Sequence, residues 1–396
     1  MRKFIVIVVV ALVLCGASFY VYKAGNVSKT YENNETKKVD NNMLSMMLET
    51  SAGSGEYQKT SASAWPTEGY IFNSSLSRCK NNSRLSWDSD KKQVLFEGNT
   101  KDDCYVYFDK TITLVDYVKA QYTGTQGENN LYLHDSSLTN GAGDNSYRYA
   151  GSSETTNNFV CFGYDSKDGS CPTDNLYRVI GLFDNHIKLI KWDYAKATLL
   201  GIDGNYVKMY DGSQISNGIN INEELGCYSI KTYYWKSSDL NLINLNTNFL
   251  NNIGNKWSSK INFHTWIVGG NSKIYNILVN ETYQNEIVSP STSETTYDAK
   301  VGLMYVSDIG YASASSLWNG YIGATSNKLL NWMHMGLYEW TITKLTSDGS
   351  YCTILDSGIN SNNKDSYYTI RPTFYLNSNI AYISGKGTKT EPIIIN

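Results

Sequence analysis

The run from residue 331 to residue 396 decides how the rest of the chain is organised. It begins NWMHMGLYEWTI (331–342), passes through a region rich in Gly, Ser and Asn, and ends TIRPTFYLNSNIAYISGKGTKTEPIII (369–395). Short apolar and aromatic runs bounded by such turn residues are typical of β-strands. We therefore expect this run to be the closing β-rich core of an exported binding domain, which the upstream segments carry or brace.

Length and composition bound the possible functions. A chain of 396 residues has room for two or three domains and a sizeable core. The formal net charge is −3 and the basic residues are scattered, so no nucleic-acid partner is expected. The 32 tyrosines suit a recognition surface, although the codon bias of a low-GC genome explains the same abundance.

The N-terminus has the pattern of an export signal. Three residues that include two basic ones, Met1 to Lys3, precede an apolar run from Phe4 to Tyr22. A run of about 20 apolar residues is long enough to cross a bilayer. We expect residues 1–25 to be an uncleaved signal-anchor in the cell membrane, with the remainder of the chain extracellular. Cleavage after Ala17, which would release a secreted protein, is the alternative.

Cysteine usage agrees with export. Six cysteines follow Cys15, and an even number in an exported chain predicts disulfides. Local spacing favours Cys79–Cys104 and Cys161–Cys171, which leaves Cys227–Cys352 by elimination. No metal site is expected, because no C-x-x-C occurs and no histidine stands at ligand spacing from a cysteine.

The sequence divides into five segments. The signal-anchor is followed by a polar stalk over 26–66, in which Met43 to Glu49 could form one or two helical turns. Short strands over 67–110 predict a small β-sandwich-like module closed by Cys79–Cys104. Residues 111–144 are expected to hold a linking helix, over 113–120, and a loop. Residues 145–396 form the predicted binding domain.

Within that domain a hairpin and a helix are the clearest elements. Strands over 176–183 and 186–192 flank the turn Asp184-Asn185, and Lys188 and Lys191 are expected on a partly solvated face. A helix is predicted from Ser238 or Asp239 to Ile253, because Leu residues and a Phe recur at three- and four-residue spacing. A further strand is predicted over 301–308.

The order of these pieces resembles a family. The segments are LYRVIGLFDNHIKLIK (176–191), SSDLNLINLNTNFLN (237–251), GLMYVSDIGYA (302–312), NWMHMGLYEWTI (331–342) and IRPTFYLNSNI (370–380). As an ordered set they resemble an exported bacterial domain family of unknown function with a fold like the formylglycine-generating enzyme and, more broadly, C-type lectins. The resemblance covers about residues 145–396. It implies an α+β fold with a β-rich, C-type-lectin-like domain, and binding more than chemistry.

Candidate catalytic and metal residues are weak. Trp318-Asn319-Gly320 lacks the acid that a calcium-dependent lectin would need. Formylglycine chemistry would require an exposed, reactive thiol, for which Cys227 and Cys352 are the candidates. The four histidines are isolated, and no recognised hydrolase motif is present. We therefore predict no catalytic residue, no cofactor and no metal.

Aromatic residues near the C-terminus are the candidate binding residues. We predict that an aromatic groove is lined by Trp318, Tyr321, His334, Tyr338, Tyr367 and Tyr368. Tryptophan and tyrosine are favoured at binding hot spots, and their rings stack on sugars or peptide side chains. Arg371 is expected to make a structural pair, with Glu339 as the candidate partner.

The sequence thus predicts a membrane-anchored surface protein for adhesion or ligand binding, with an extracellular glycan or protein as its ligand. The first alternative is a structural subunit of a cell-envelope or pilus-like complex. The second is an enzyme related to formylglycine generation, which a reactive Cys227 or Cys352 would favour.

Overall fold

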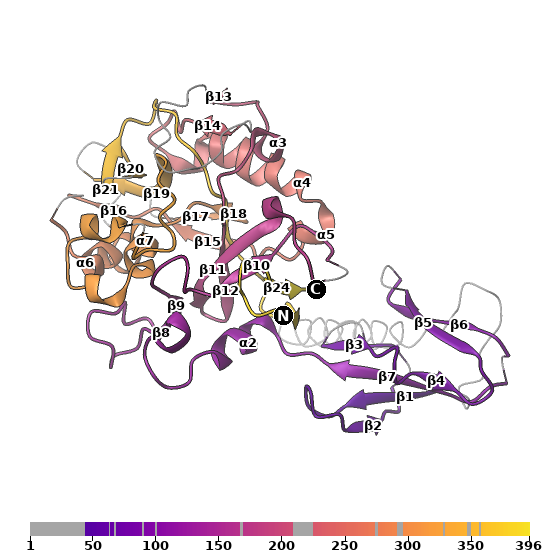
Figure 1. Ribbon diagram of the computed structural model, residues 1–396. Helices are drawn as coiled ribbons and strands as arrows, with labels where there is room; N and C mark the ends of the chain where they lie inside the picture. The colour runs from indigo at the N-terminus through magenta and orange to yellow at the C-terminus, as the bar shows by residue number, and fades with distance from the viewer. Residues whose placement is uncertain are drawn as a thin grey trace, which may run out of the picture. The chain divides into compact units, whose positions relative to one another are not determined.

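The computed structural model describes residues 44–396, except 63, 67–68, 89–90, 100, 167–168, 209–224, 274–275, 291–295, 328, 347–349 and 356–357. The chain forms two compact units, unit 1 (Met1–Ile112) and unit 2 (Thr113–Asn396) (Figure 1). The predicted signal-anchor and the first part of the predicted stalk lie outside the described residues.

Unit 1 is built on a mixed sheet. Its strands are β1 (Leu44–Glu49), β2 (Tyr57–Lys59), β3 (Tyr70–Phe72), β4 (Arg78–Cys79) and β7 (Cys104–Lys110). The order is β2-β1-β7-β3, with β4 also on β7, and β1 runs parallel to β7. Two further strands, β5 (Arg84–Asp88) and β6 (Gln93–Glu97), form a separate hairpin. Met43 to Glu49 was predicted to be helical and part of a stalk. Residues 44–49 are instead a strand of this sheet, because they extend along β7.

The core of unit 1 follows the period of two expected of a strand. Cys104, Val106 and Phe108 of β7 point inward and are buried, while the residues between them are partly exposed. Met46 and Trp65 pack against them. This core contains no residue of unit 2, so unit 1 is stabilised by its own burial of apolar surface and by the Cys79–Cys104 disulfide.

Unit 2 is organised around a nine-stranded sheet. Its main path is β18-β22-β12-β11-β10-β24-β23, and β8 and β9 join it at β11. The strands are β8 (Leu131–Leu133), β9 (Tyr147–Tyr149), β10 (Phe159–Cys161), β11 (Leu176–Phe183), β12 (His186–Lys191), β18 (Val301–Gly302), β22 (Thr373–Tyr375), β23 (Tyr382–Ser384) and β24 (Ile393–Ile395). The C-terminal strands β22 and β24 therefore pair with strands that lie some 200 residues earlier in sequence.

Smaller sheets complete unit 2 (Figure 1). The pairs are β13 (Tyr206–Lys208) with β14 (Gly226–Tyr228), and β15 (His264–Ile267) with β17 (Thr296–Ala299). A four-stranded sheet holds β16 (Gly270–Asn271), β19 (Glu339–Leu345), β20 (Tyr351–Leu355) and β21 (Gly358–Asn362).

The helices are short. The α-helices of the described residues are α2 (Leu114–Ala120), α3 (Ala197–Leu200), α4 (Leu250–Asn252), α5 (Asn255–Ser258), α6 (Val279–Tyr283) and α7 (Val306–Ala312). Two π-helices, η5 (Leu240–Phe249) and η6 (Gln284–Val288), continue into or from α4 and α6. Single 3-10 turns are η1 (Glu128–Asn130), η2 (Thr173–Asn175), η4 (Trp235–Ser237), η7 (Ser315–Leu317) and η8 (Ile322–Ser326).

Several predicted elements are present. The hairpin turn Asp184-Asn185 has positive φ at both residues, as a tight two-residue hairpin requires. The linking helix is α2, which Thr113 caps by accepting a hydrogen bond from the backbone N–H of Asp116 at 3.0 Å. The predicted helix near 239–253 is η5 followed by α4. The predicted strand over 301–308 is only partly present: β18 ends at Gly302, and α7 begins at Val306.

The predicted fold class is wrong. Strands predominate over a few short helices, whereas an α+β, C-type-lectin-like domain behind a membrane helix was expected. No helix among the described residues is both long and apolar enough to cross a membrane. The predicted β-sandwich-like module is a mixed sheet with an added hairpin, because β1, taken from the supposed stalk, pairs with β7.

Candidate ligand-binding site

Two of the six predicted groove residues are buried. The exposed fractions of Trp318 and His334 are 2% and 5%. The Trp318 ring lies 5.0 Å from that of His134 and 5.6 Å from that of Tyr311, between centroids, and its indole N–H donates to the Ser313 carbonyl at 3.1 Å. Both residues therefore contribute to packing and present no ring face to a ligand.

The other four groove residues are at least partly exposed. Tyr338 stacks on Tyr368, with ring centroids 5.2 Å apart and planes inclined by 15°. Tyr367 lies beneath the ammonium group of Lys231, 5.1 Å from its ring centroid. Tyr321 is about half exposed and bridges to another strand-like segment at Leu278. The structure thus brings Tyr338 and Tyr368 together and leaves the predicted groove incomplete.

A cavity of about 250 Å³ opens elsewhere in unit 2, lined by residues of β9, β12, β15, α6 and α7. None of the six predicted residues lines it. Charged, hydroxyl-bearing and aromatic side chains predominate in its wall, which consists of Asp144, Ser146, Arg148, Phe183, Asp184, His186, Lys188, His264, Thr265, Ile267, Tyr283, Ile287, Tyr305, Ser307, Asp308 and Tyr375.

The first buried ion pair of this cavity joins Lys188 and Asp308. Lys188 Nζ donates to Asp308 Oδ2 at 2.6 Å, and both side chains are at most 2% exposed. Asp308 is held by a second hydrogen bond, from the backbone N–H of Tyr305 at the start of α7, at 2.9 Å. Burial lowers the pKa of Lys188, and the nearby charge of Arg148 acts in the same direction, while Asp308 opposes them.

The expectation that Lys188 and Lys191 face solvent is therefore wrong. Their exposed fractions are 1% and 2%. The physical reason is the position of β12, which pairs with β11 on one side and β22 on the other and is covered on both faces. A lysine in such a strand requires an acidic partner or another acceptor.

The second buried ion pair joins Arg148 and Asp144. Arg148 Nη2 donates to Asp144 Oδ2 at 2.5 Å, and Nε donates to Ser146 Oγ at 2.8 Å. β9 brings Arg148 to this place by pairing with β11 opposite Gly181. A Cβ atom at Gly181 would lie 2.3 Å from the Tyr147 carbonyl oxygen, so only glycine permits this approach.

The carboxylate of Asp144 is fully engaged. Oδ1 accepts from the backbone N–H and the hydroxyl of Ser146, and Oδ2 accepts from Arg148 and from the Tyr283 hydroxyl at 2.8 Å. Burial acts against ionisation, but Arg148 and Ser146 outweigh it and hold the pKa of Asp144 well below its usual range. Asp144 is therefore ionised at neutral pH, and its role is to orient Arg148.

Aromatic rings form the walls between the two pairs. His264 stacks on Tyr375, with centroids 3.9 Å apart. The Lys188 ammonium lies 4.4 Å from the Tyr305 ring centroid and 5.4 Å from that of Tyr375. The Arg148 guanidinium lies 4.7 Å from the Phe183 ring centroid. Such contacts partly compensate buried cations for the water they lose.

Several polar groups of the cavity wall keep unused hydrogen-bonding capacity. Within the part of the chain that the structure describes, Arg148 Nη1, the Tyr375 hydroxyl and the His264 ring nitrogens have no hydrogen-bond partner, and Asp308 Oδ1 accepts from none. Lys188 Nζ has three N–H groups and uses one. Among the described residues, none of these atoms belongs to the fully buried ones that lack a partner, so they can be reached from the cavity by water or a ligand.

A buried acid lies directly behind the wall. Glu286 is fully buried, and its carboxylate accepts from the Ser307 backbone N–H at 3.0 Å and the Thr343 hydroxyl at 2.5 Å. Burial raises the pKa of Glu286 to about 7, although these hydrogen bonds act in the opposite direction. Glu286 thus positions the N-terminus of α7, and with it Ser307 and Asp308.

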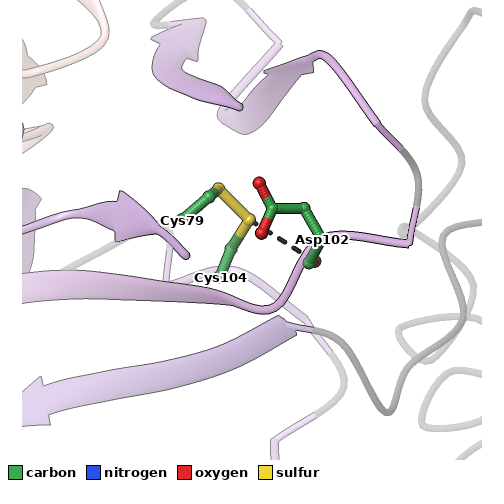
Figure 2. Close-up of side chains that lie close together, drawn as sticks. All are labelled: Cys79, Asp102 and Cys104. Atoms are coloured by element: carbon green, nitrogen blue, oxygen red, sulfur yellow. Dashed lines mark hydrogen bonds between the residues drawn. A yellow bond between two sulfur atoms is a disulfide. The ribbon is translucent and has the colours of Figure 1, made fainter. Parts of the chain in front are cut away.

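One cluster in unit 1 has the residue types of a metal site. Cys79, Asp102 and Cys104 lie together, but the two sulfur atoms form a disulfide and cannot serve as thiolate ligands (Figure 2). Asp102 accepts from the backbone N–H groups of Asn81 at 2.8 Å and Ser83 at 3.1 Å. Burial opposes ionisation of Asp102, and these bonds prevail and lower its pKa. The cluster is a structural clasp.

The cysteine predictions hold for two pairs of three. Cys79–Cys104 and Cys161–Cys171 are disulfides, as predicted. Cys227, on β14, and Cys352, on β20, are both buried and are not joined to each other. Burial raises the pKa of the Cys227 thiol to about 12, so this thiol is protonated at neutral pH. That is the opposite of what thiolate chemistry needs.

The sequence contains a signal for the cavity that the expected sites did not include. Lys188 interrupts the apolar run HIKLIK, and Asp308 interrupts the apolar run GLMYVSDIGYA. Charges inside such runs predict buried partners. Which lysine meets which acid depends on pairing across 120 residues, which no local pattern contains.

Comparison with known proteins adds no further assignment. No family model, no curated protein and no solved structure matches this chain. Nothing therefore identifies the family resemblance suggested by the sequence, and any function has to be argued from the cavity itself.

Proposed function

We propose that this chain is an exported protein that binds a small polar ligand in the cavity of unit 2. One observation carries the proposal. The cavity is lined by charged side chains that are almost fully buried, Arg148 and Lys188, and both keep N–H groups with no partner among the described residues. Sites that combine apolar walls with a few convergent polar groups are typical of small-molecule binding.

Two disulfides support export. Cys79–Cys104 and Cys161–Cys171 are bonds that persist in oxidising compartments. Anchoring through the N-terminus concerns residues outside the described part of the chain. Adhesion through the Tyr338–Tyr368 pair is a weaker proposal, since Trp318 and His334, two of the rings predicted to complete that groove, are buried. No specific observation favours the assembly-subunit or the enzyme alternative.

A steric plug tests the proposal. Thr265 is exposed on β15 at the cavity wall, so Thr265→Trp should fill the cavity without touching either ion pair. Thr296→Trp is the matched control: Thr296 is also exposed, lies on the partner strand β17, and does not line the cavity. Ligand-detected saturation-transfer NMR on the full chain would use neutral sugars, amino acids and nucleosides as probes.

We expect at least one probe to bind the natural protein and the Thr296→Trp variant, and not the Thr265→Trp variant. Binding that survives Thr265→Trp, or no binding by any probe, would contradict the proposal. Far-ultraviolet circular dichroism of all three proteins checks that the fold is unchanged.

A further inference from the structure

The buried cations that line the cavity are already paired, and Asp184, which is in no ion pair within the described part of the chain, is exposed to solvent at the wall. Arg148 is joined to Asp144 at 2.5 Å and Lys188 to Asp308 at 2.6 Å, and neither cation is more than 3% exposed at its side chain. Among the described residues an ionised ligand would find no uncompensated buried charge of opposite sign; Asp184 is solvated, so its attraction for a cation is screened by water. The ionised ligand would either displace a carboxylate from its cation or be buried without a counter-charge, and both are costly in a site of low dielectric.

The two ion pairs leave both hydrogen-bond donors and hydrogen-bond acceptors unused in the cavity wall. Arg148 Nη1 and the remaining N–H groups of Lys188 are donors, Asp308 Oδ1 is an acceptor, and the Tyr375 hydroxyl can do either. A hydroxyl group both donates and accepts. A ligand with several hydroxyls can therefore use these groups while the two ion pairs stay intact.

The volume of the cavity and the chemistry of its wall narrow the class of ligand further. A cavity of about 250 Å³ is smaller than the roughly 300–1,000 Å³ of sites for drug-sized ligands. It fits one six-membered ring with its hydroxyls rather than a chain of rings. Tyr305, Tyr375 and Ile267 provide apolar surface, which suits the C–H faces of such a ring.

We propose that the cavity binds an uncharged, polyhydroxylated ligand of the size of one sugar ring and discriminates against ionised ligands of the same shape. This inference rests on the proposed function, and names its ligand class. The free sugar and the end of a larger glycan present the same chemistry, and only the first is required for the test.

The experiment uses matched pairs of ligands on the full chain, measured by isothermal titration calorimetry at pH 7.5. Each pair is a neutral methyl glycoside, with glucose, galactose and mannose as the sugars, and the corresponding 6-carboxylate or 2-amino compound. We expect at least one neutral glycoside to bind, and its ionised counterparts to bind at least tenfold more weakly. The Thr265→Trp and Thr296→Trp variants show whether the heat arises in the cavity.

A charge variant weakens the expected preference. Asp308→Asn keeps an acceptor for the Tyr305 N–H but leaves Lys188 Nζ without its carboxylate. A uronate can then supply the missing counter-charge, so the preference for the neutral glycoside over the uronate should shrink. If this variant does not fold, the Thr265→Trp and Thr296→Trp pair still decides the question with the natural protein.

The outcomes separate the two proposals. Binding of a uronate, an amino sugar or an amino acid as tightly as any neutral glycoside, abolished by Thr265→Trp, would overturn the ligand class and leave the small-ligand function intact. If no probe shows binding that Thr265→Trp abolishes, both the function and the ligand class are overturned.

Discussion

Several charged side chains of unit 2 are buried with hydrogen-bond partners, and Glu286 is the clearest example. It is fully buried behind the cavity wall, with hydrogen bonds from Ser307 and Thr343, and desolvation raises its pKa to about 7 from an ordinary value of 4.5. An acid whose pKa is raised by folding stabilises the protein while it is protonated. That contribution is fully present below pH 4.5 and is lost as the pH rises through about 7.

We therefore expect the Glu286→Gln variant to lack this pH-dependent change in the free energy of unfolding. The free energy of unfolding of the natural protein, relative to that of Glu286→Gln, should fall by about 3 kcal/mol between pH 4.5 and pH 7.5, since one pKa unit corresponds to about 1.4 kcal/mol. Urea unfolding at several pH values measures it. A difference between the two proteins that stays constant with pH would contradict the assignment.

His264 makes the difference measurement necessary. Burial lowers the pKa of His264 to about 4, so its contribution to stability is present above pH 6.5 and is lost as the pH falls through about 4. The two groups act with opposite sign in nearly the same pH range. The pH dependence of the natural protein alone would therefore conceal both.

At the scale of elements, the Cys79–Cys104 disulfide ties β4 to β7 in the sheet of unit 1. The core of unit 1 is small, so the disulfide, whose cysteines are separated by 25 residues in sequence, contributes a large part of its stability. Loop entropy in the unfolded chain makes such a bond worth about 3 kcal/mol. In a variant that carries both Cys79→Ala and Cys104→Ala, the free energy of unfolding of unit 1 should fall by about 3 kcal/mol.

Hydrogen exchange followed by mass spectrometry locates the loss. We expect the opening free energy to fall for peptides of unit 1 and to stay the same for peptides of unit 2. The matched control replaces Cys161 and Cys171, which close a shorter loop of separation 10 within unit 2, and should affect peptides of unit 2. An equal loss in both units from the first variant would argue against separate cores.

At the scale of the whole molecule, unit 2 holds its own core. Its largest apolar cluster runs from Leu114 to Ile395 and includes no residue of unit 1. We expect residues 112–396, expressed alone, to unfold cooperatively in urea with the near-ultraviolet circular dichroism of a packed protein. A control ending at residue 368 lacks β22, which pairs with β12 and β18, β24, which pairs with β10, and β23, which pairs with β24, and should not fold. Failure of the longer chain to fold would show that unit 2 depends on unit 1.

The sequence allowed the prediction of features whose cause is local. The turn Asp184-Asn185, helix α2 with its Thr113 cap, the hairpin of β5 and β6 and the disulfides Cys79–Cys104 and Cys161–Cys171 all depend on neighbours within about 25 residues. The strand that became β7 was also expected, although its partner β1 lies much earlier in the chain. The expected pair of Arg371 and Glu339 is also confirmed, with Nε to Oε1 at 2.7 Å. In each case nearby residues, or two conspicuous charges in apolar runs, carried the signal.

Tertiary structure alone decided the cavity and the fates of the predicted site residues. Lys188 meets Asp308 because β12 and α7 both border the cavity, and Arg148 reaches the same cavity because Gly181 allows β9 to pair with β11. The packing of unit 2 also buries Trp318 and His334. The local sequence determines which residues form turns, caps and short strands. Which charges lose their water, and therefore need a partner, is decided by packing between segments far apart in the chain, as with Lys188 and Asp308, which are separated by 120 residues.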